Sequence, residues 1–243
     1  GRPGGPAPPA LWESLCLMAR NGPYLQQSCA SGLLQGVGFT IPAILFEVLE
    51  DQGYGFEESA LTSFAFIMAG VGLGLLLGRA VPYTAAPEVR SGCVLALFWS
   101  GTLAVWLLHL VDSYGLGSGS LLQHAAIMAL MVVSGSCSLG FVNMALPLVC
   151  EAAQPVAECY SGGVTELLGF LMGAVITQLS SGSGFVVCAS ASLLAASLMS
   201  AALVGGLPWR LRLRGVPWKS LPPDLQSNLL DHPDKMETST PKR

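Results

Sequence analysis

Long apolar runs alternate with short polar segments along this chain, and six of the runs are long enough to cross a bilayer as helices. A helical span needs about 20 apolar residues to traverse the hydrocarbon core. The six predicted spans cover about residues 24–49, 60–81, 92–111, 121–150, 162–180 and 185–207. Because the fourth is too long for one straight crossing, we expect Pro147 to break its inner end, or the helix to continue beyond the membrane.

The composition supports a membrane protein. Hydrophobic residues make up 52% of the chain and charged residues only 11%, whereas a soluble domain carries about 25% charged residues. The chain therefore lacks the charge to cover a water-facing surface, and the lipid bilayer is its first expected partner. No basic patch of the nucleic-acid-binding type occurs outside the C-terminal tail, so we exclude nucleic acid as a partner. The predicted fold class is an all-α membrane protein with six transmembrane helices.

The distribution of charge predicts the topology. When the six spans are paired, all 11 Lys and Arg residues lie on one side of the membrane. They are Arg2, Arg20, Arg79, Arg90, Arg210, Arg212, Arg214, Lys219, Lys235, Lys242 and Arg243. The loops after the first and third spans hold acids such as Glu57 and Asp112 but no base, and the turn 181–184 falls on the same side as these loops. Since cytosolic loops are enriched in Lys and Arg, both termini are expected in the cytosol.

Three regions follow from this pattern. We expect residues 1–22 to be a cytosolic linker, 23–208 a six-helix transmembrane bundle, and 209–243 a cytosolic tail that is partly disordered. The Pro- and Gly-rich start lacks the apolar segment of a signal peptide and indicates a fragment of a longer protein. The seven cysteines form no C-x-x-C pair, so we interpret them as small buried side chains rather than as disulfide or zinc ligands.

Enzymatic motifs are missing from the sequence. There is no H-E-x-x-H, no G-x-S-x-G, no P-loop and no pair of carboxylates at a useful spacing. We therefore expect no catalytic residue, no bound metal and no cofactor.

The candidate binding residues are polar or aromatic groups inside the spans, because a polar group in hydrocarbon is costly and often functional. Glu166 lies about one helical turn into the fifth span and shares a helix face with Phe170 and Gly173. A carboxylate beside an aromatic ring suits a cation or a proton-coupled step. The alternative is that Glu166 reaches the inner interface, or stabilises the helix start through the helix dipole.

A second group of candidates lies in the first and fourth spans. Gln35 and Phe39 are near the middle of the first span, where Pro42 is expected to interrupt the helix, and broken helices mark binding sites in many transporters. The ring of Phe39 offers a face to a quaternary ammonium, although packing against lipid or other helices is the alternative. Asn143 is a weaker candidate, whose alternative role is a hydrogen bond to a neighbouring helix.

Glycine repeats predict close helix contacts. The repeated glycines are Gly32 and Gly36 in the first span, Gly70, Gly74 and Gly78 in the second, and Gly169 and Gly173 in the fifth. Each repeat clears a groove along one helix face so that a neighbouring backbone can approach. Such grooves serve packing alone, or they let helices move past one another during alternating access.

Three stretches resemble a known transporter family. Residues 20–24 (Arg-Asn-Gly-Pro-Tyr) precede the first span, and Gly32, Gly36, residues 39–41 (Phe-Thr-Ile) and Leu45 lie within it. Glu151, Pro155, Glu158, Ser161 and Gly163 form an E-x3-P-x2-E-x2-S-x-G segment before the fifth span, with Gly173 following in register. Over about residues 11–208 the chain thus resembles the C-terminal half of a major facilitator superfamily transporter, and more specifically solute carrier family 49, the feline leukaemia virus subgroup C receptor-related group.

The resemblance implies a secondary transporter whose N-terminal six-helix half would be the partner of this bundle. Family members are associated with choline and ethanolamine, with heme, or with vitamin-like solutes. By resemblance, Phe39 would lie where the family places an aromatic residue at the cargo site, whereas Glu166 and Phe170 depart from the family pattern. From their positions in the spans, Gln35, Glu166, Phe170 and Asn143 are expected to line the cavity for this small-molecule solute with Phe39.

The resemblance also implies an inner gate, in which Glu151 and Glu158, together with Arg79, would pair across to the N-terminal half. The expected location is the plasma membrane, or alternatively the lysosome. The alternative function is a non-transporting membrane receptor or scaffold.

Overall fold

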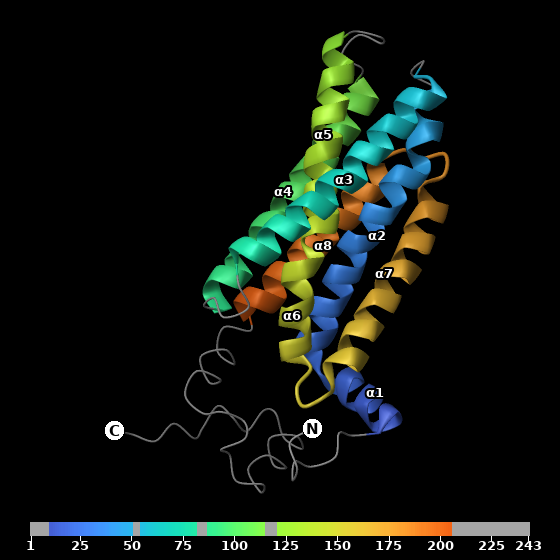
Figure 1. Cartoon of the computed structure of the whole chain (residues 1–243). Helices are drawn as coiled ribbons and strands as arrows, with labels where there is room; N and C mark the ends of the chain where they lie inside the picture. Colours follow the sequence, from blue (N-terminus) through green and yellow to red (C-terminus); the bar gives the residue numbers. More distant parts are fainter. Residues whose placement is uncertain (1–9, 51–53, 82–86, 115–120, 206–243) are drawn as a thin grey trace, which may run out of the picture. The chain divides into compact units, whose positions relative to one another are not determined.

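A computed structural model describes residues 10–50, 54–81, 87–114 and 121–205, which form helices joined by short turns without any β-strand in these ranges. The helices are α1 (Leu11–Arg20), α2 (Gly22–Glu50), α3 (Phe56–Ala80), α4 (Pro87–Tyr114), α5 (Leu121–Gly140), α6 (Val142–Ala152), α7 (Glu158–Ser180) and α8 (Val186–Gly205) (Figure 1). One compact unit comprises Gly1–Ala202, and a second begins at Leu203 within α8. Six segments of the described chain are long and apolar enough to span a membrane, so the protein is an all-α multi-pass membrane protein.

Each predicted span coincides with one helical segment, which confirms the six-span pattern. The helices extend further than hydropathy indicates: α3 begins at Phe56 and α7 begins at Glu158. Hydropathy marks only the part of a helix that lies in hydrocarbon, whereas the helical hydrogen bonds continue into the interfacial region. The predicted turn between the last two spans is also confirmed, because it follows Ser180 and contains two glycines with positive φ.

The region expected to be a linker contains a helix. In α1, Ser14 and Met18 are buried one turn apart, while Leu11 and Trp12 are 55% and 75% exposed. This face packs α1 against the starts of α2 and α7. The segment predicted as a linker over residues 1–22 therefore contains a packed helix at residues 11–20. A helix of 10 residues is too short to register as a membrane span, so the search for long apolar runs missed it.

Two predictions about proline are also wrong. Helix α2 continues through Pro42 without a break, because neighbouring helices in membrane bundles can satisfy the backbone group that proline leaves free. The fourth span is interrupted at Phe141 rather than at Pro147, which lies inside α6. The break follows Gly140, and glycine favours the helix weakly, so the helix yields upstream of the proline instead of at it.

The main helix contacts join the first three spans to the last three. The most extensive contacts join α2 to α7 and α3 to α5, followed by α4 with α5 (Figure 1). If α2, α3 and α4 form one group of three spans, and α5–α6, α7 and α8 the other, the first helix of each group packs on the second helix of the other. Hydrogen bonds from Thr102 to the Ser192 carbonyl and from Trp99 to Ser200, each 3.0 Å, add α8 to α4.

Glycines determine how closely α3 approaches α5. A Cβ added to Gly70 would lie 2.6 Å from the Leu139 Cβ, and a Cβ added to Gly135 would overlap the Phe66 carbonyl. Any larger residue would have to push the two helices apart. At Gly78, by contrast, nothing lies within 4 Å of an added Cβ. The predicted groove of α3 is therefore confirmed at Gly70, but it does not extend to Gly78.

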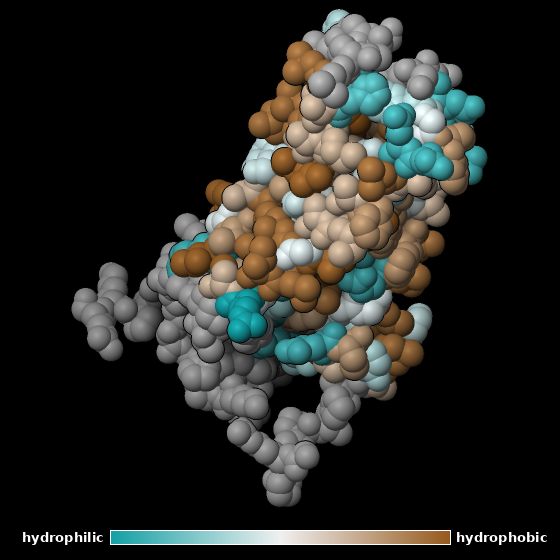
Figure 2. Space-filling model, turned by 45° about the horizontal axis from the view of Figure 1, so that its top comes forward, coloured by the Kyte–Doolittle hydropathy of each residue, from teal (hydrophilic) through white to brown (hydrophobic). Residues whose placement is uncertain are grey.

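The two ends of the bundle differ in charge. Arg20, Arg79 and Arg90 lie where α1 and α3 end and α4 begins, and we call this end the basic end. At the other end, the acidic end, Glu57 and Glu58 begin α3. Between these ends the visible face is largely apolar (Figure 2). Its exposed side chains are suited to lipid rather than to water.

Candidate functional site

Helices α2 and α7 run in the same direction and are joined by hydrogen bonds at a repeating sequence offset. The Tyr24 hydroxyl donates to the Ser161 carbonyl at 3.0 Å, and the hydroxyls of Ser28 and Thr165 lie 3.0 Å apart. Further along, Thr40 donates to the Gly173 carbonyl at 3.2 Å and lies 3.0 Å from the Thr177 hydroxyl. Together with a fourth pair, these contacts form a row that we call the polar seam. Its pairs are Tyr24–Ser161, Ser28–Thr165, Gln35–Glu166 and Thr40–Thr177. The seam fixes the register of α2 against α7.

Close backbone approach makes this seam possible. A Cβ added to Gly36 would lie 2.8 Å from the Gly173 nitrogen, and one added to Gly32 would lie 3.3 Å from the Gly169 nitrogen. The glycine repeats of α2 and α7 therefore face each other, as the sequence predicts. Because neither helix has a side chain at these points, the flanking polar side chains reach across a short gap.

The Gln35–Glu166 pair lies in the middle of the seam. The Gln35 Nε2 donates to the Glu166 Oε2 at 2.7 Å. Gln35 is only 5% exposed, and Glu166 is half-buried. A hydrogen bond to a charged acceptor contributes about 1.5–3 kcal/mol, so this contact is strong enough to orient both side chains. Glu166 therefore does not merely reach the helix start, because its carboxylate is held against α2.

An aromatic stack follows directly beyond this pair. The rings of Phe39 and Phe170 lie 5.2 Å apart between centroids with an interplanar angle of 3°. Each ring is four residues beyond a member of the amide–carboxylate pair, which places both contacts on one face of the helix pair. Phe39 and Phe170 are 37% and 60% exposed, so the stack is open on one side. An open ring face is attractive to a cation.

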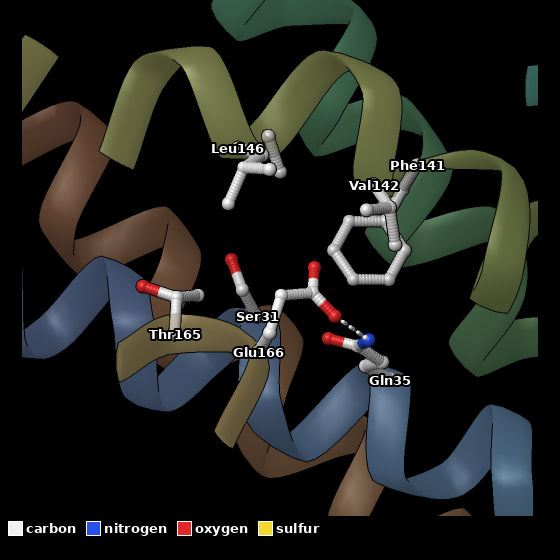
Figure 3. Close-up of a pocket in the computed structure, with 8 residues that line it drawn as sticks. Ser31, Gln35, Phe141, Val142, Leu146, Thr165 and Glu166 are labelled. Carbon is white, nitrogen blue, oxygen red and sulfur yellow. Dashed lines mark hydrogen bonds between the residues drawn. The ribbon is translucent and has the colours of Figure 1, made fainter. Parts of the chain in front are cut away.

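A small pocket adjoins Glu166 between α2, α6 and α7. Its lining includes Ser31, Gln35, Phe141, Val142, Ala145, Leu146, Thr165 and Glu166 (Figure 3). The space in this partly open pocket is about 10 Å³, close to the minimum that holds one water molecule. An organic solute cannot fit in this space, so binding of such a solute would have to use the open face that carries the aromatic stack.

Asn143 does not join these residues. It is exposed on α6, and its Nδ2 lies 2.8 Å from the position that a Cβ on Gly74 of α3 would occupy. The structure thus places Asn143 against α3, and the prediction that groups it with Gln35 and Glu166 is wrong. The sequence suggested this grouping because Asn143 is a polar residue within a span, but Asn143 continues the contact with α3 that Leu139 and Gly140 make before the interruption.

The three residues predicted for the inner gate all lie at the basic end. Arg79 and Glu158 are exposed near the end of α3 and the start of α7. Glu151 instead forms an ion pair within this chain: its carboxylate accepts hydrogen bonds of 2.6 and 3.2 Å from the Arg90 guanidinium. In this conformation Glu151 therefore already has a partner within the chain, and its pairing with the N-terminal half stays a prediction.

Arg90 is the site residue that the sequence reasoning missed. Its side chain is 8% exposed, and its pairing with Glu151 ties the start of α4 to the end of α6. A signal did exist, because an Arg opens the third span and an acid closes the fourth on the same side of the membrane. Next to this pair, the Asn21 Nδ2 donates to the Ala152 carbonyl at 2.7 Å and joins the start of α2 to the same corner.

Comparison with known proteins finds neither a matching family model nor a matching curated protein.

Proposed function

We propose that this chain is the C-terminal six-helix half of a major facilitator-type secondary transporter, and that it moves a small organic solute by alternating access. The helix pairing supports this proposal. The exchange of α2 with α7 and of α3 with α5 matches two groups of three spans of inverted topology, an arrangement that occurs within each half of such transporters. In this proposal an N-terminal six-helix half completes the carrier.

The observation that carries the proposal is the open face of α2 and α7. A carboxylate, an amide and two stacked rings lie together on neighbouring turns of two membrane helices: Glu166, Gln35, Phe39 and Phe170. Polar groups inside a membrane protein are retained at a cost, and they commonly bind a solute or an ion. Since both rings remain exposed, the second half of the carrier would cover them and close the cavity.

The proposed solute class follows from the chemistry of this face together with the family resemblance. Ring faces attract organic ammonium groups by about 0.5–2 kcal/mol, and a nearby carboxylate adds attraction for the same charge. Choline and ethanolamine carry such a group. Heme and vitamin-like solutes such as pyridoxine remain in the proposal because of the resemblance to solute carrier family 49.

We place the inner gate of this carrier at the basic end. Glu158 and Arg79 are exposed there, and neither forms an ion pair with another residue of the described ranges, so both suit pairing across to the N-terminal half. Glu151 would take part by exchanging its partner Arg90 for a base of the other half. Such partner exchange is a common basis of switching between two packed states.

The same charge pattern leads to the proposed orientation. Because Lys and Arg accumulate on the cytosolic side, the basic end would face the cytosol, and both termini would lie there. The proposed location is the plasma membrane or the lysosomal membrane.

An uptake and efflux screen tests the proposal. Cells producing the full-length protein are loaded with, or exposed to, radiolabelled choline, ethanolamine, heme or pyridoxine. A solute whose movement exceeds that of cells without the protein, and saturates with concentration, supports the carrier. If none of these solutes moves in either direction while the protein is present in the membrane, this proposal fails for the solute classes named.

A further inference from the structure

An unpaired hydroxyl points into the pocket beside Glu166. Ser31 is 3% exposed, and its Oγ has no hydrogen-bond partner among the described residues. Figure 3 shows this oxygen directed into the space between α2 and α6, on the same side as the Glu166 carboxylate. A buried hydroxyl without a partner is unfavourable, so a bound molecule that bonds to it would stabilise the site.

The size and lining of the pocket limit what that molecule can be. The space of about 10 Å³ holds one water molecule and nothing larger. The remaining lining is apolar except for Gln35 and Thr165, and the Thr165 hydroxyl is already engaged with Ser28 and the Ser161 carbonyl. The Ser31 Oγ and the Glu166 carboxylate can each bond to a water in this space, and the Gln35 Oε1 is a further acceptor in the lining.

Glu166 has no cationic neighbour in this pocket. Of the eight lining residues, only Glu166 is charged, and its bonded partner Gln35 is neutral. Cys29 follows Ser28, which contacts Thr165 directly before Glu166. The other titratable groups of the surrounding helices lie toward the helix ends: Tyr24, Glu47 and Glu50 on α2, Cys150 and Glu151 on α6, and Glu158, Cys159 and Tyr160 on α7. Glu166 lies eight residues after Glu158, which corresponds to about 12 Å along the helix axis.

We propose that Glu166 is a proton-binding residue of the carrier and that it exchanges its proton with a water held between its carboxylate and the Ser31 hydroxyl. This inference rests on the proposed function and adds a coupling ion to it. A proton delivered by hydronium at the water position converts the carboxylate to a neutral carboxylic acid and leaves water, and release forms hydronium again. No other side chain has to change its charge.

The neighbouring side chains suit both protonation states. The Gln35 amide donates to the ionised carboxylate through Nε2, and its Oε1 can accept from the protonated acid after the amide rotates. The Phe39–Phe170 stack lies one turn further along the same face. Protonation would therefore remove a negative charge next to the proposed solute site, and this links the proton to the affinity for a cationic solute.

Infrared difference spectroscopy of the full chain in lipid, recorded during a pH titration, tests the proton site without any solute. We expect a protonated-carboxyl band that shifts in D₂O and is lost in Glu166→Gln. Glu166→Asp retains a carboxyl group and should keep a titrating band at a different frequency. This result would show that a substitution at position 166 does not by itself unfold the protein. Ser31→Ala should change the band frequency, because the bound water loses one partner. Glu57→Gln, an exposed acid of the acidic end, is the control and should leave the band unchanged.

A band that persists in Glu166→Gln, or a Ser31→Ala spectrum identical to that of the unchanged protein, overturns the proposed proton site. These results do not depend on transport. A negative solute screen with an intact Glu166 band would count against the carrier alone, and a positive screen without the band would count against the proton site alone.

Discussion

Arg90 and Glu151 are 61 residues apart in the sequence, and their side chains form a two-point ion pair with N–O distances of 2.6 and 3.2 Å. The Arg90 side chain is 8% exposed and that of Glu151 is 26% exposed. Partial burial reduces the screening of the pair by water, and the two parallel hydrogen bonds fix its geometry. The pair therefore holds the start of α4 to the end of α6 at the basic end.

Removing one partner should cost more stability than removing both. Glu151→Ala leaves a buried guanidinium without its carboxylate, and we expect a loss of roughly 2 kcal/mol, which corresponds to about 5 °C in the unfolding midpoint. The double variant Arg90→Met with Glu151→Met should lose less, because no uncompensated charge remains. Thermal unfolding in detergent measures the difference. Equal losses in the single and double variants would show that the Arg90 charge without Glu151 carries no extra cost.

The contact between α2 and α7 should be intolerant of a methyl group at Gly36. A Cβ at this position would lie 2.8 Å from the Gly173 nitrogen, so Gly36→Ala has to push two backbones apart. We expect a destabilisation of about 1–3 kcal/mol, measured by thermal unfolding.

The matched control for this variant is Gly78→Ala. Nothing lies within 4 Å of a Cβ at Gly78, and alanine favours the helix more than glycine does. The control should therefore be neutral or slightly stabilising. A loss of stability as large as that of Gly36→Ala would show that the contact with α7 is not the cause.

Tyr54 should make stability depend on alkaline pH. It lies between α2 and α3, and burial, aided by the charge of Glu58, raises the pKa of its hydroxyl above the ordinary value of 10.0. Above pH 10 the unfolded chain releases this proton while the folded chain retains it, so stability falls as pH rises through the folded-state pKa. Below pH 10 the contribution is fully present.

Tyr54→Phe tests this dependence, because it removes the ionisable group and keeps the ring that stacks on His124 at 4.1 Å. The loss of stability above pH 10 should become smaller in this variant. Tyr114→Phe, at a position that is 81% exposed, is the control and should retain the full dependence. Identical pH profiles for the two variants would remove Tyr54 as the cause.

Thiol labelling should distinguish the two ends of the bundle. Cys16 and Cys159 are exposed thiols on α1 and at the start of α7, close to the basic end. In sealed vesicles with the cytosolic face outward, a membrane-impermeant maleimide should label both. A cysteine placed at Glu57 of a variant without these two thiols should react only after detergent is added. Labelling of the Glu57 position in sealed vesicles would contradict the proposed orientation.

The number and order of the spans could be predicted from the sequence because each follows from a local quantity, the length of an apolar run. The facing glycines of α2 and α7 were also predictable, since a four-residue repeat lies on one helix face wherever the helix packs. The pairing of Gln35 with Glu166 was out of reach. Each residue could be identified separately as a polar group in hydrocarbon. The two are 131 residues apart, so their contact depends on how α2 packs against α7.

The missed features have a similar cause. In the sequence, Arg90 resembles the other bases of the predicted cytosolic side. Its pairing with Glu151 is visible only in the folded chain. Pro42 and Pro147 suggested helix breaks, yet both lie inside helices, and the backbone yields instead at Phe141, directly after the weak helix former Gly140. Local propensity predicts where a helix is weak, whereas the neighbouring helices determine whether it breaks.

The central claim is that the open face of α2 and α7 binds the transported solute. Measuring solute uptake by the Phe39→Ala variant tests this claim most directly. The comparison uses a solute identified by the screen, equal amounts of protein at the membrane, and Phe64→Ala as a control at an exposed phenylalanine of α3. We predict that Phe39→Ala lowers uptake at limiting solute concentration about tenfold, the effect of losing roughly 1.4 kcal/mol of ring–cation attraction, and that Phe64→Ala does not. Unchanged uptake kinetics in Phe39→Ala would contradict the account.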